Sequence, residues 1–186
     1  MRSRAPRKLL RASTIALFVA CGGEAPLPEL AEVPAIELTA QDGSAFSTAS
    51  LRGKVWIAGF IFTTCPSVCP MITTQMGNLE RKIEGDLHFV SFTVDPVHDN
   101  PEVLRRYAET HSANLARWTF LTGEEDAVRR AIQDGLKVRM GERAGNDITH
   151  GTHLVLVDKT ARIRGFYRTD ADGLRNLERD ARRLLE

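Results

Sequence analysis

Residues 60–70, Phe-Ile-Phe-Thr-Thr-Cys-Pro-Ser-Val-Cys-Pro, place the strongest constraint on how this chain folds. The apolar run 55–62 predicts a buried strand, which breaks into a loop containing Cys65 and Cys69. Pro70 has no N–H group and is tolerated only in the first turn of a helix, so a helix should begin near Val68. Cys69 would then lie among free backbone N–H groups, which favour a thiolate. Two thiols in one loop can form a disulfide or hold a soft metal ion.

The N-terminal residues 1–20 have the pattern of an export signal. Five basic residues precede an apolar segment, 12–20, that is too short to span a bilayer. The sequence Leu17-Phe18-Val19-Ala20-Cys21 is similar to a bacterial lipobox, in which cleavage precedes the cysteine and the cysteine is lipidated. The alternative is an ordinary secretory signal with a spare Cys21. Both interpretations predict export to the periplasmic side of a bacterial membrane, and the first adds a lipid anchor.

Processing of the N-terminus changes the number of free thiols and the charge of the chain. Three cysteines are an odd number, but lipidation would take Cys21 out of the thiol pool, so only the pair in the loop remains. The net charge falls from +1 to −4, because five positive charges and no acidic residue are lost, and no basic patch for nucleic acid remains. Residues 21–34, with three prolines, should form a flexible membrane tether, and residues 35–186 one globular domain.

Strands and helices alternate through the domain. The predicted strands cover residues 36–38, 55–62, 87–94, 118–121, 154–157 and 163–167. The predicted helices begin near Val68, at Asn100 as N-cap, near Thr122 or Gly123, and before Leu174. The polar segment 139–147 should be a mobile loop or a hairpin. This order predicts an α/β sandwich with a central mixed sheet flanked by helices.

A strand followed by a cysteine pair at a helix start is the layout of a thioredoxin, but two features differ. The spacing is Cys-x-x-x-Cys rather than Cys-x-x-Cys. Thioredoxin-like proteins place a cis-proline before the strand that faces the cysteines, and here Thr152 occupies that position. A peroxiredoxin is excluded because Phe62 and Pro66 stand where the threonine three residues before a reactive cysteine would be.

The segment that replaces the proline contains two histidines, His150 and His153. Two thiolates and one imidazole make a three-coordinate site that copper accepts as Cu(I) or Cu(II). Positions three apart in a strand point to opposite faces, so only one histidine can face the cysteines. We expect His150 to be the ligand, with His153 as its rival and a simple surface histidine as the alternative.

Other candidate side chains have a structural interpretation beside the functional one. Met71 and Met76 could be thioether ligands, but their helical spacing favours core packing. His88 and His111 should be structural. Two further residues, His98 and Asp95, follow a strand at the same end of the sheet as the cysteine loop. Either could support the site from outside, and the sequence leaves their roles open.

The chain resembles the Sco/SenC family of exported, membrane-tethered copper proteins with a thioredoxin fold. The resemblance covers about residues 36–186 and rests on these motifs: Phe60-x-Phe62-Thr63-x-Cys65-Pro66-x-x-Cys69-Pro70, Asp95-Pro96 with Asp99-x-Pro101-Glu102-x-Leu104, Trp118-x-Phe120-Leu121-Thr122-Gly123, and His150 before Leu154-x-Leu156-Val157-Asp158. It departs from the family at Gly151 and in the turn Lys159-Thr160-Ala161.

The resemblance implies that Cys65, Cys69 and His150 bind copper. It implies delivery of copper to the CuA site during cytochrome c oxidase assembly, with the CuA-bearing subunit or another cuproenzyme as partner. The competing functions are a thiol-disulfide oxidoreductase, served by a thioredoxin-like reductant, that keeps the CuA cysteines reduced, and a copper or redox sensor. A metallochaperone is thus expected rather than an enzyme. The structural alternative is a plain Cys65–Cys69 disulfide.

Overall fold

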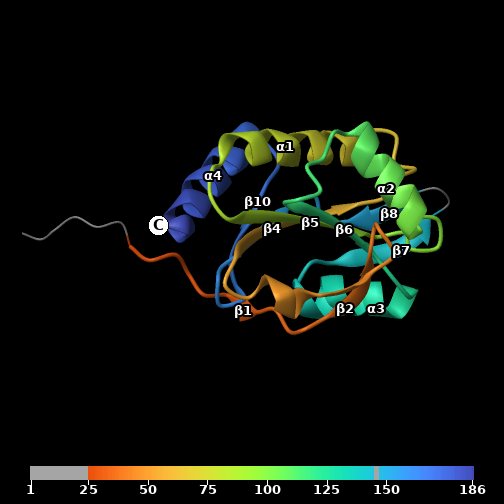
Figure 1. Ribbon diagram of the computed structural model, residues 1–186, viewed down its shortest axis with the longest axis horizontal. Coiled ribbons are helices and arrows are strands. Elements are labelled where there is room, and N and C mark those ends of the chain that lie inside the picture. The colour runs from red at the N-terminus through yellow and green to blue at the C-terminus, as the bar shows by residue number, and fades with distance from the viewer. Residues whose placement is uncertain (1–24, 145–146) are drawn as a thin grey trace, which may run out of the picture.

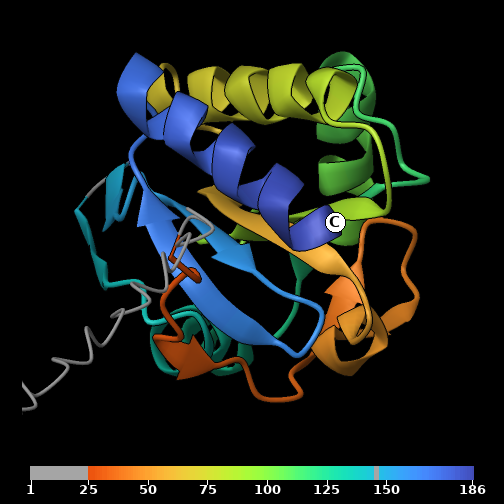
Figure 2. The same cartoon turned by 90° about the vertical axis from the view of Figure 1, so that its left-hand side faces the viewer.

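The computed structural model describes residues 25–144 and 147–186, and of residues 142–144 and 147–150 it describes the backbone alone. An eight-stranded mixed sheet has the order β1-β10-β9-β4-β5-β6-β2-β3. Helices α1, α2 and α4 cover one face, and α3 lies on the other (Figures 1 and 2). The predicted α/β sandwich with a mixed sheet is confirmed. The signal segment and Cys21 lie outside the described residues.

The elements follow the chain in this order: β1 (Ala31–Glu32), β2 (Glu37–Ala40), β3 (Ala45–Ser47), η1 (Thr48–Leu51), β4 (Val55–Ile61), α1 (Val68–Lys82), β5 (Leu87–Thr93), α2 (Pro101–Thr110), β6 (Trp118–Thr122), α3 (Glu125–Arg130), η2 (Ala131–Gly135), β7 (Met140–Ala144), β8 (Asp147–His150), β9 (Leu154–Val157), β10 (Arg162–Tyr167) and α4 (Ala171–Leu185).

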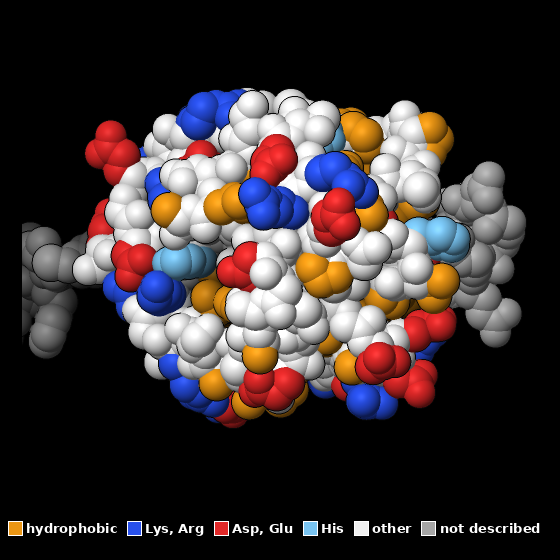
Figure 3. Space-filling view, turned by 45° about the vertical axis from the view of Figure 1, so that its right-hand side comes forward, with side chains coloured by type: hydrophobic (Ala, Val, Ile, Leu, Met, Phe, Trp, Pro, Cys, Tyr) orange, Lys and Arg blue, Asp and Glu red, His pale blue; other side chains and the backbone are white. Residues whose placement is uncertain are grey.

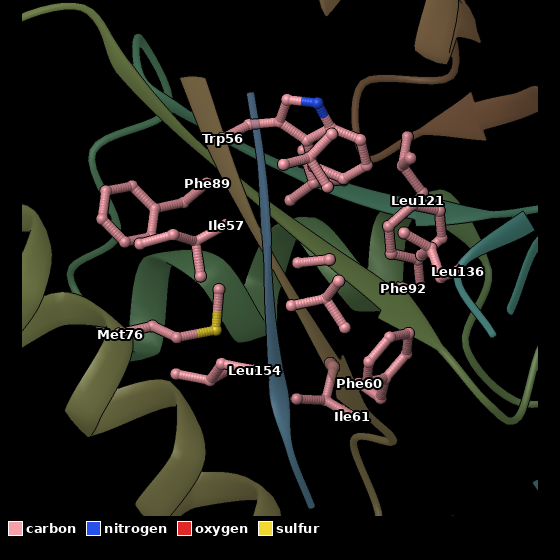
Figure 4. Packing of buried hydrophobic residues seen from close by; sticks show 14 of the residues in the cluster. Trp56, Ile57, Phe60, Ile61, Met76, Phe89, Phe92, Leu121, Leu136 and Leu154 are labelled. Carbon is pink, nitrogen blue, oxygen red and sulfur yellow. The ribbon is translucent and has the colours of Figure 1, made fainter. Parts of the chain in front are cut away.

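Strand β4 forms the centre of the sheet and leads into the cysteine loop. It runs parallel to β5 and antiparallel to β9, and all seven of its residues are buried. A strand covered on both faces has a continuous apolar sequence rather than an alternating one, which explains the run that the sequence shows. Figure 4 shows side chains of β4, β5 and β9 packed together, with Met76 of α1 reaching into them.

Polar side chains fix where two of the helices begin. Asn100 Oδ1 accepts a hydrogen bond from the Val103 N–H at 3.0 Å, and Asp170 Oδ1 accepts one from Gly173 at 2.8 Å. Such caps satisfy N–H groups that have no partner inside the helix. The predicted start of α2 at Asn100 and of α1 near Val68 are both confirmed. The predicted third helix is shorter, because α3 passes into the π-helical turn η2 at Ala131.

The N-terminal segment of the described chain lies on the domain, which corrects part of the predicted tether. Ala31 of β1 pairs with Ile163 at the start of β10. Arg164 donates to the carbonyl of Leu27 at 2.5 Å and to that of Pro28 at 2.9 Å. Residues 25–34 are therefore part of the folded body rather than a flexible link; the composition of this stretch gave no sign of these contacts.

Segment β1 lies at the far end of the sheet from the cysteine loop. Ile163 pairs with Val157 of β9, and Val157 pairs with Trp56 near the start of β4. The cysteine loop follows the other end of β4. In Figure 1 the first described residues, drawn in red, lie at the left, and the β7–β8 hairpin lies at the right.

The predicted loop or hairpin over 139–147 is a hairpin of β7 and β8. Among the residues that the structure describes, no helix has both the length and the apolar character to cross a membrane.

Candidate metal and thiol site

The cysteine loop connects β4 to α1 and places Cys65 at the helix start. Ser67 is the N-cap of α1, but its side chain makes no capping hydrogen bond. Instead the Cys69 N–H donates to Cys65 Sγ at 3.4 Å. The sulfur of Cys65 thus occupies the place that a capping oxygen usually takes.

This position determines the acidity of Cys65, which is partly exposed. Burial opposes ionisation of the thiol and is the largest single influence on the pKa of Cys65. The N–H groups of Ser67, Cys69 and Val68, together with the Cys69 thiol, outweigh it, so the pKa of Cys65 lies below the ordinary thiol value. Cys65 is therefore the more nucleophilic sulfur of the pair at neutral pH.

Cys69 has the opposite environment. Its side chain is 0% exposed, and its Sγ accepts a hydrogen bond from the Phe62 N–H at 3.4 Å. Burial raises the pKa of Cys69 strongly, and the negative charges of Cys65 and Asp99 raise it further. The two cysteines are thiols in this structure, with no disulfide between them. They supply two sulfur donors that fit a soft metal ion, since Cu(I) prefers thiolates.

A buried carboxylate, Asp99, lies directly beneath the loop. The Thr63 N–H donates to Asp99 Oδ2 at 3.1 Å and the Thr63 hydroxyl to Oδ1 at 2.5 Å. The Thr93 hydroxyl donates to Oδ2 at 2.6 Å. Burial raises the pKa of Asp99, and these hydrogen bonds oppose the rise. We expected Asp99 only as part of a helix-start motif; its place under the loop was missed.

Asp95 and His98 lie on the same segment after β5. His98 Nδ1 is 2.9 Å from Asp95 Oδ2, and Asp95 is almost fully buried whereas His98 is exposed. A carboxylate that holds one ring nitrogen leaves the other directed elsewhere. The structure therefore pairs these two residues with each other, and whether either supports the site from outside stays open.

The position of His150 relative to the cysteines stays a prediction. The backbone of His150 ends β8 and pairs with Met140 of β7, and its side chain belongs to the undescribed ones. Considering only the described side chains, no group of three histidine, cysteine, aspartate or glutamate residues is placed to hold a metal.

His153 and Met71 line the same surface cavity, which has a volume of about 550 Å³ and lies beside the start of α4. Met71 is 46% exposed, so the expectation that it packs in the core is wrong, whereas Met76 is fully buried as expected.

The remaining histidines have structural surroundings, as predicted. His88 Nε2 is 3.0 Å from Lys54 Nζ, and burial and that charge lower the pKa of His88. His111 packs on Tyr107 with ring centroids 4.3 Å apart, and burial lowers the pKa of His111. The hydroxyl of Tyr107 lies 2.9 Å from that of Thr73 on α1. The sequence gave no sign of this contact near Cys69.

The described part of the face shown in Figure 3 carries no large cluster of like charges. On the face shown in Figure 3, Lys and Arg side chains alternate with Asp and Glu side chains in small groups.

Fold and loop together define a class of protein: a thioredoxin-like α/β domain with an asymmetric dithiol at a helix start and a carboxylate under the loop. A model of the SCO1/SenC family matches residues 26–186, and the chain belongs to that family.

Two relatives span most of the chain. A SCO1 protein homolog of Bacillus subtilis (strain 168) is 34% identical over 163 residues, which cover 84% of each chain. A protein of Stutzerimonas stutzeri whose description names copper binding is 32% identical over 160 residues, 81% of this chain and 77% of its own.

Solved structures agree with the fold. The crystal structure of a SCO1/SenC family lipoprotein from Bacillus anthracis str. Ames has a TM-score of 0.75 and 31% identity, over 83% of this chain and 95% of that one. The structure of BsSco is described as that of a member of the Sco family of cytochrome c oxidase assembly proteins with a disulfide switch. It has a TM-score of 0.74 and 28% identity, over 82% and 92% of the two chains.

Proposed function

We propose that this protein binds copper as cargo through Cys65, Cys69 and His150 and delivers it to the CuA site during cytochrome c oxidase assembly. The observation that supports it most is the asymmetric thiol pair, one sulfur accessible and the other buried, at the helix start of a Sco-family fold. The relative described as copper-binding and the neighbour described as an oxidase assembly protein point the same way.

The asymmetry suits transfer by ligand exchange. Cys69, held by the Phe62 N–H, keeps the ion at the protein while the accessible Cys65 exchanges its bond for a sulfur of the recipient. One bond is replaced at a time, so no free ion is released. Exchange with a disulfide of another protein, which takes up the two electrons and two protons and becomes a dithiol, would convert the pair to a Cys65–Cys69 disulfide, remove two donors and end binding.

An anaerobic titration with Cu(I) against a competing chelator tests the proposal. The reduced protein from Gly22 onward should hold one equivalent, lost in Cys65→Ser and in Cys69→Ser and weakened in His150→Ala. The matched control is His153→Ala, which should bind like the wild type. Weak, non-stoichiometric binding that His150→Ala leaves unchanged would reject the copper site, and loss confined to His153→Ala would transfer the ligand role to His153.

The second candidate is a thiol-disulfide oxidoreductase that keeps CuA cysteines reduced, and the same asymmetry favours it. The Cys65 thiolate would attack a disulfide of the partner and displace one partner thiolate. The Cys69 sulfur would then attack Cys65, releasing the second partner thiolate and leaving a Cys65–Cys69 disulfide. Rapid reduction of an oxidised CuA domain by copper-free protein, equal in His150→Ala, would favour this role; a rate no faster than that of glutathione would exclude it.

The location is a separate part of the proposal. Residues 1–20 act as an export signal and Cys21 is the lipidated anchor, in agreement with the neighbour described as a lipoprotein. Radiolabelled palmitate should enter the wild type and leave a Cys21→Ser variant unlabelled. Label retained by the variant would contradict the anchor.

A further inference from the structure

Asp99 connects the cysteine loop to the end of a central strand. The carboxylate is 0% exposed. It accepts two hydrogen bonds from Thr63, two positions before Cys65 in the loop, and one from Thr93, the last residue of β5. Because β5 is hydrogen-bonded to β4 along its whole length, these contacts tie the loop to the most rigid part of the sheet.

The direction of the hydrogen bonds requires an acceptor at both oxygens. The Thr93 hydroxyl already accepts a hydrogen bond from the Asp95 N–H at 2.9 Å, so its single hydrogen is directed to Asp99. The Thr63 N–H can only donate, and its nitrogen lies 3.3 Å from Oδ1 and 3.1 Å from Oδ2. A carboxylate satisfies these donors, whereas an asparagine in this orientation would turn an N–H group toward one of them.

The Phe62 N–H holds Cys69 Sγ, and the next N–H along the chain, that of Thr63, holds the Asp99 carboxylate, so the carboxylate lies near the buried sulfur. A negative charge near that sulfur disfavours a bare thiolate and favours a sulfur that holds a cation. Position and charge therefore act in the same direction on the loop.

We propose that Asp99 is a positioning residue for the dithiol: through Thr63 it holds the loop so that Cys65 and Cys69 stay together, and its charge favours a bound cation. The part that concerns the cation rests on the proposed copper function. The part that concerns the spacing of the thiols does not.

Asp99→Asn and Thr63→Val are the test variants. The first keeps the shape and removes the charge, and the second keeps the shape and removes one donor. The matched control is Asp158→Asn. Asp158 is likewise a buried carboxylate that accepts hydrogen bonds from a threonine, Thr160, but it lies in the β9–β10 turn, at the end of the sheet away from the loop.

The first readout needs no copper. The equilibrium constant of the Cys65–Cys69 disulfide is measured in glutathione buffers by trapping thiols. A loosened loop lowers the effective concentration of one thiol at the other, so the disulfide of Asp99→Asn should be about tenfold less stable. Thr63→Val should shift it in the same direction by less, and Asp158→Asn should match the wild type. An unchanged constant in Asp99→Asn, or an equal change in Asp158→Asn, would overturn the inference.

The second readout is copper itself. Asp99→Asn should bind Cu(I) about tenfold more weakly and shift the Cu(II)–thiolate absorption band, as loss of an outer partner of a metal site does. Unaltered affinity and spectrum in this variant would remove the role of the charge. If the wild type binds no copper, the proposed function fails, and the disulfide constants still decide whether Asp99 positions the thiols.

Discussion

Cys65 and Cys69 are four residues apart and chemically unequal. The N–H groups at the start of α1 lower the pKa of Cys65 against the effect of burial, while burial raises that of Cys69. The proline and spacing pattern predicted a helix start here, which is confirmed. It placed the favoured thiolate at Cys69, and that prediction is wrong: the N–H groups at the helix start act on Cys65, whereas Cys69 is buried. The sequence could not show this, because burial of Cys69 depends on how Phe62 and the loop fold back over it.

Alkylation tests this inequality. In reduced protein at neutral pH, iodoacetamide should modify Cys65 at least about tenfold faster than Cys69, because the thiolate is the reacting species and Cys69 is buried. The pH at which the rate at Cys65 reaches half its maximum should lie below the ordinary thiol pKa. Peptide mapping identifies the site, and Cys65→Ser serves as the control. Modification of Cys69 first would contradict the assignment.

The buried thiol also makes stability depend on pH. The pKa of Cys69 is raised by folding, so above the ordinary thiol pKa the folded state binds more protons than the unfolded state, and the free energy of unfolding falls as pH rises. The slope from this group is at most about 1.4 kcal/mol per pH unit. Urea unfolding of reduced, metal-free protein between pH 8 and 10 should show a steeper fall in the wild type than in Cys69→Ala. Parallel curves for the two proteins would refute a contribution of the Cys69 thiol to the pH dependence of stability.

At the scale of elements, local signals identified most of the fold. The continuous apolar run predicted β4, and Asn100 before Pro101 predicted the start of α2. Strand β1 has two residues and no pattern of its own, so only its partner β10 defines it. The position of Asp99 at the cysteine loop was not predicted for the same reason: Thr63, which donates to Asp99, is 36 positions away in sequence.

The packing of α1 on β4 is tight at Gly59. A Cβ at this position would collide with Sδ of Met76, which is fully buried among strand side chains (Figure 4). Gly59→Ala should therefore lower the free energy of unfolding by about 1–3 kcal/mol.

A double-mutant cycle checks the cause. Met76→Ala alone should cost about 2–5 kcal/mol through the cavity it leaves. Combined with Gly59→Ala it should cost less than the sum of the two single changes, because the added methyl group then meets empty space. Strictly additive effects in denaturant titrations would show that Met76 is not what the methyl group meets.

At the scale of the whole molecule, residues 25–33 are joined to the domain by their contact with the sheet. Val33 is buried, the Leu30 N–H donates to the Ile163 carbonyl at 2.9 Å, and Arg164 bridges Asp158 and two carbonyls of this segment. A chain beginning at Pro34 should be less stable than one beginning at Ala25 by about 2–4 kcal/mol, from the lost apolar burial and charge-assisted hydrogen bonds. Coincident urea unfolding curves would mean that the segment contributes nothing.

The attachment of β1 at the far end of the sheet also has a mechanical consequence. If Cys21 carries the lipid anchor proposed above, tension from the membrane would act on a two-residue edge strand and on Arg164, not on the dithiol loop. The edge strand should then detach before the rest of the sheet, and its release would lengthen the linker by about 30 Å, the extended length of residues 25–33. The domain would move farther from the membrane while the loop and its thiols remain folded, because the attachment and the dithiol lie at opposite ends of the sheet.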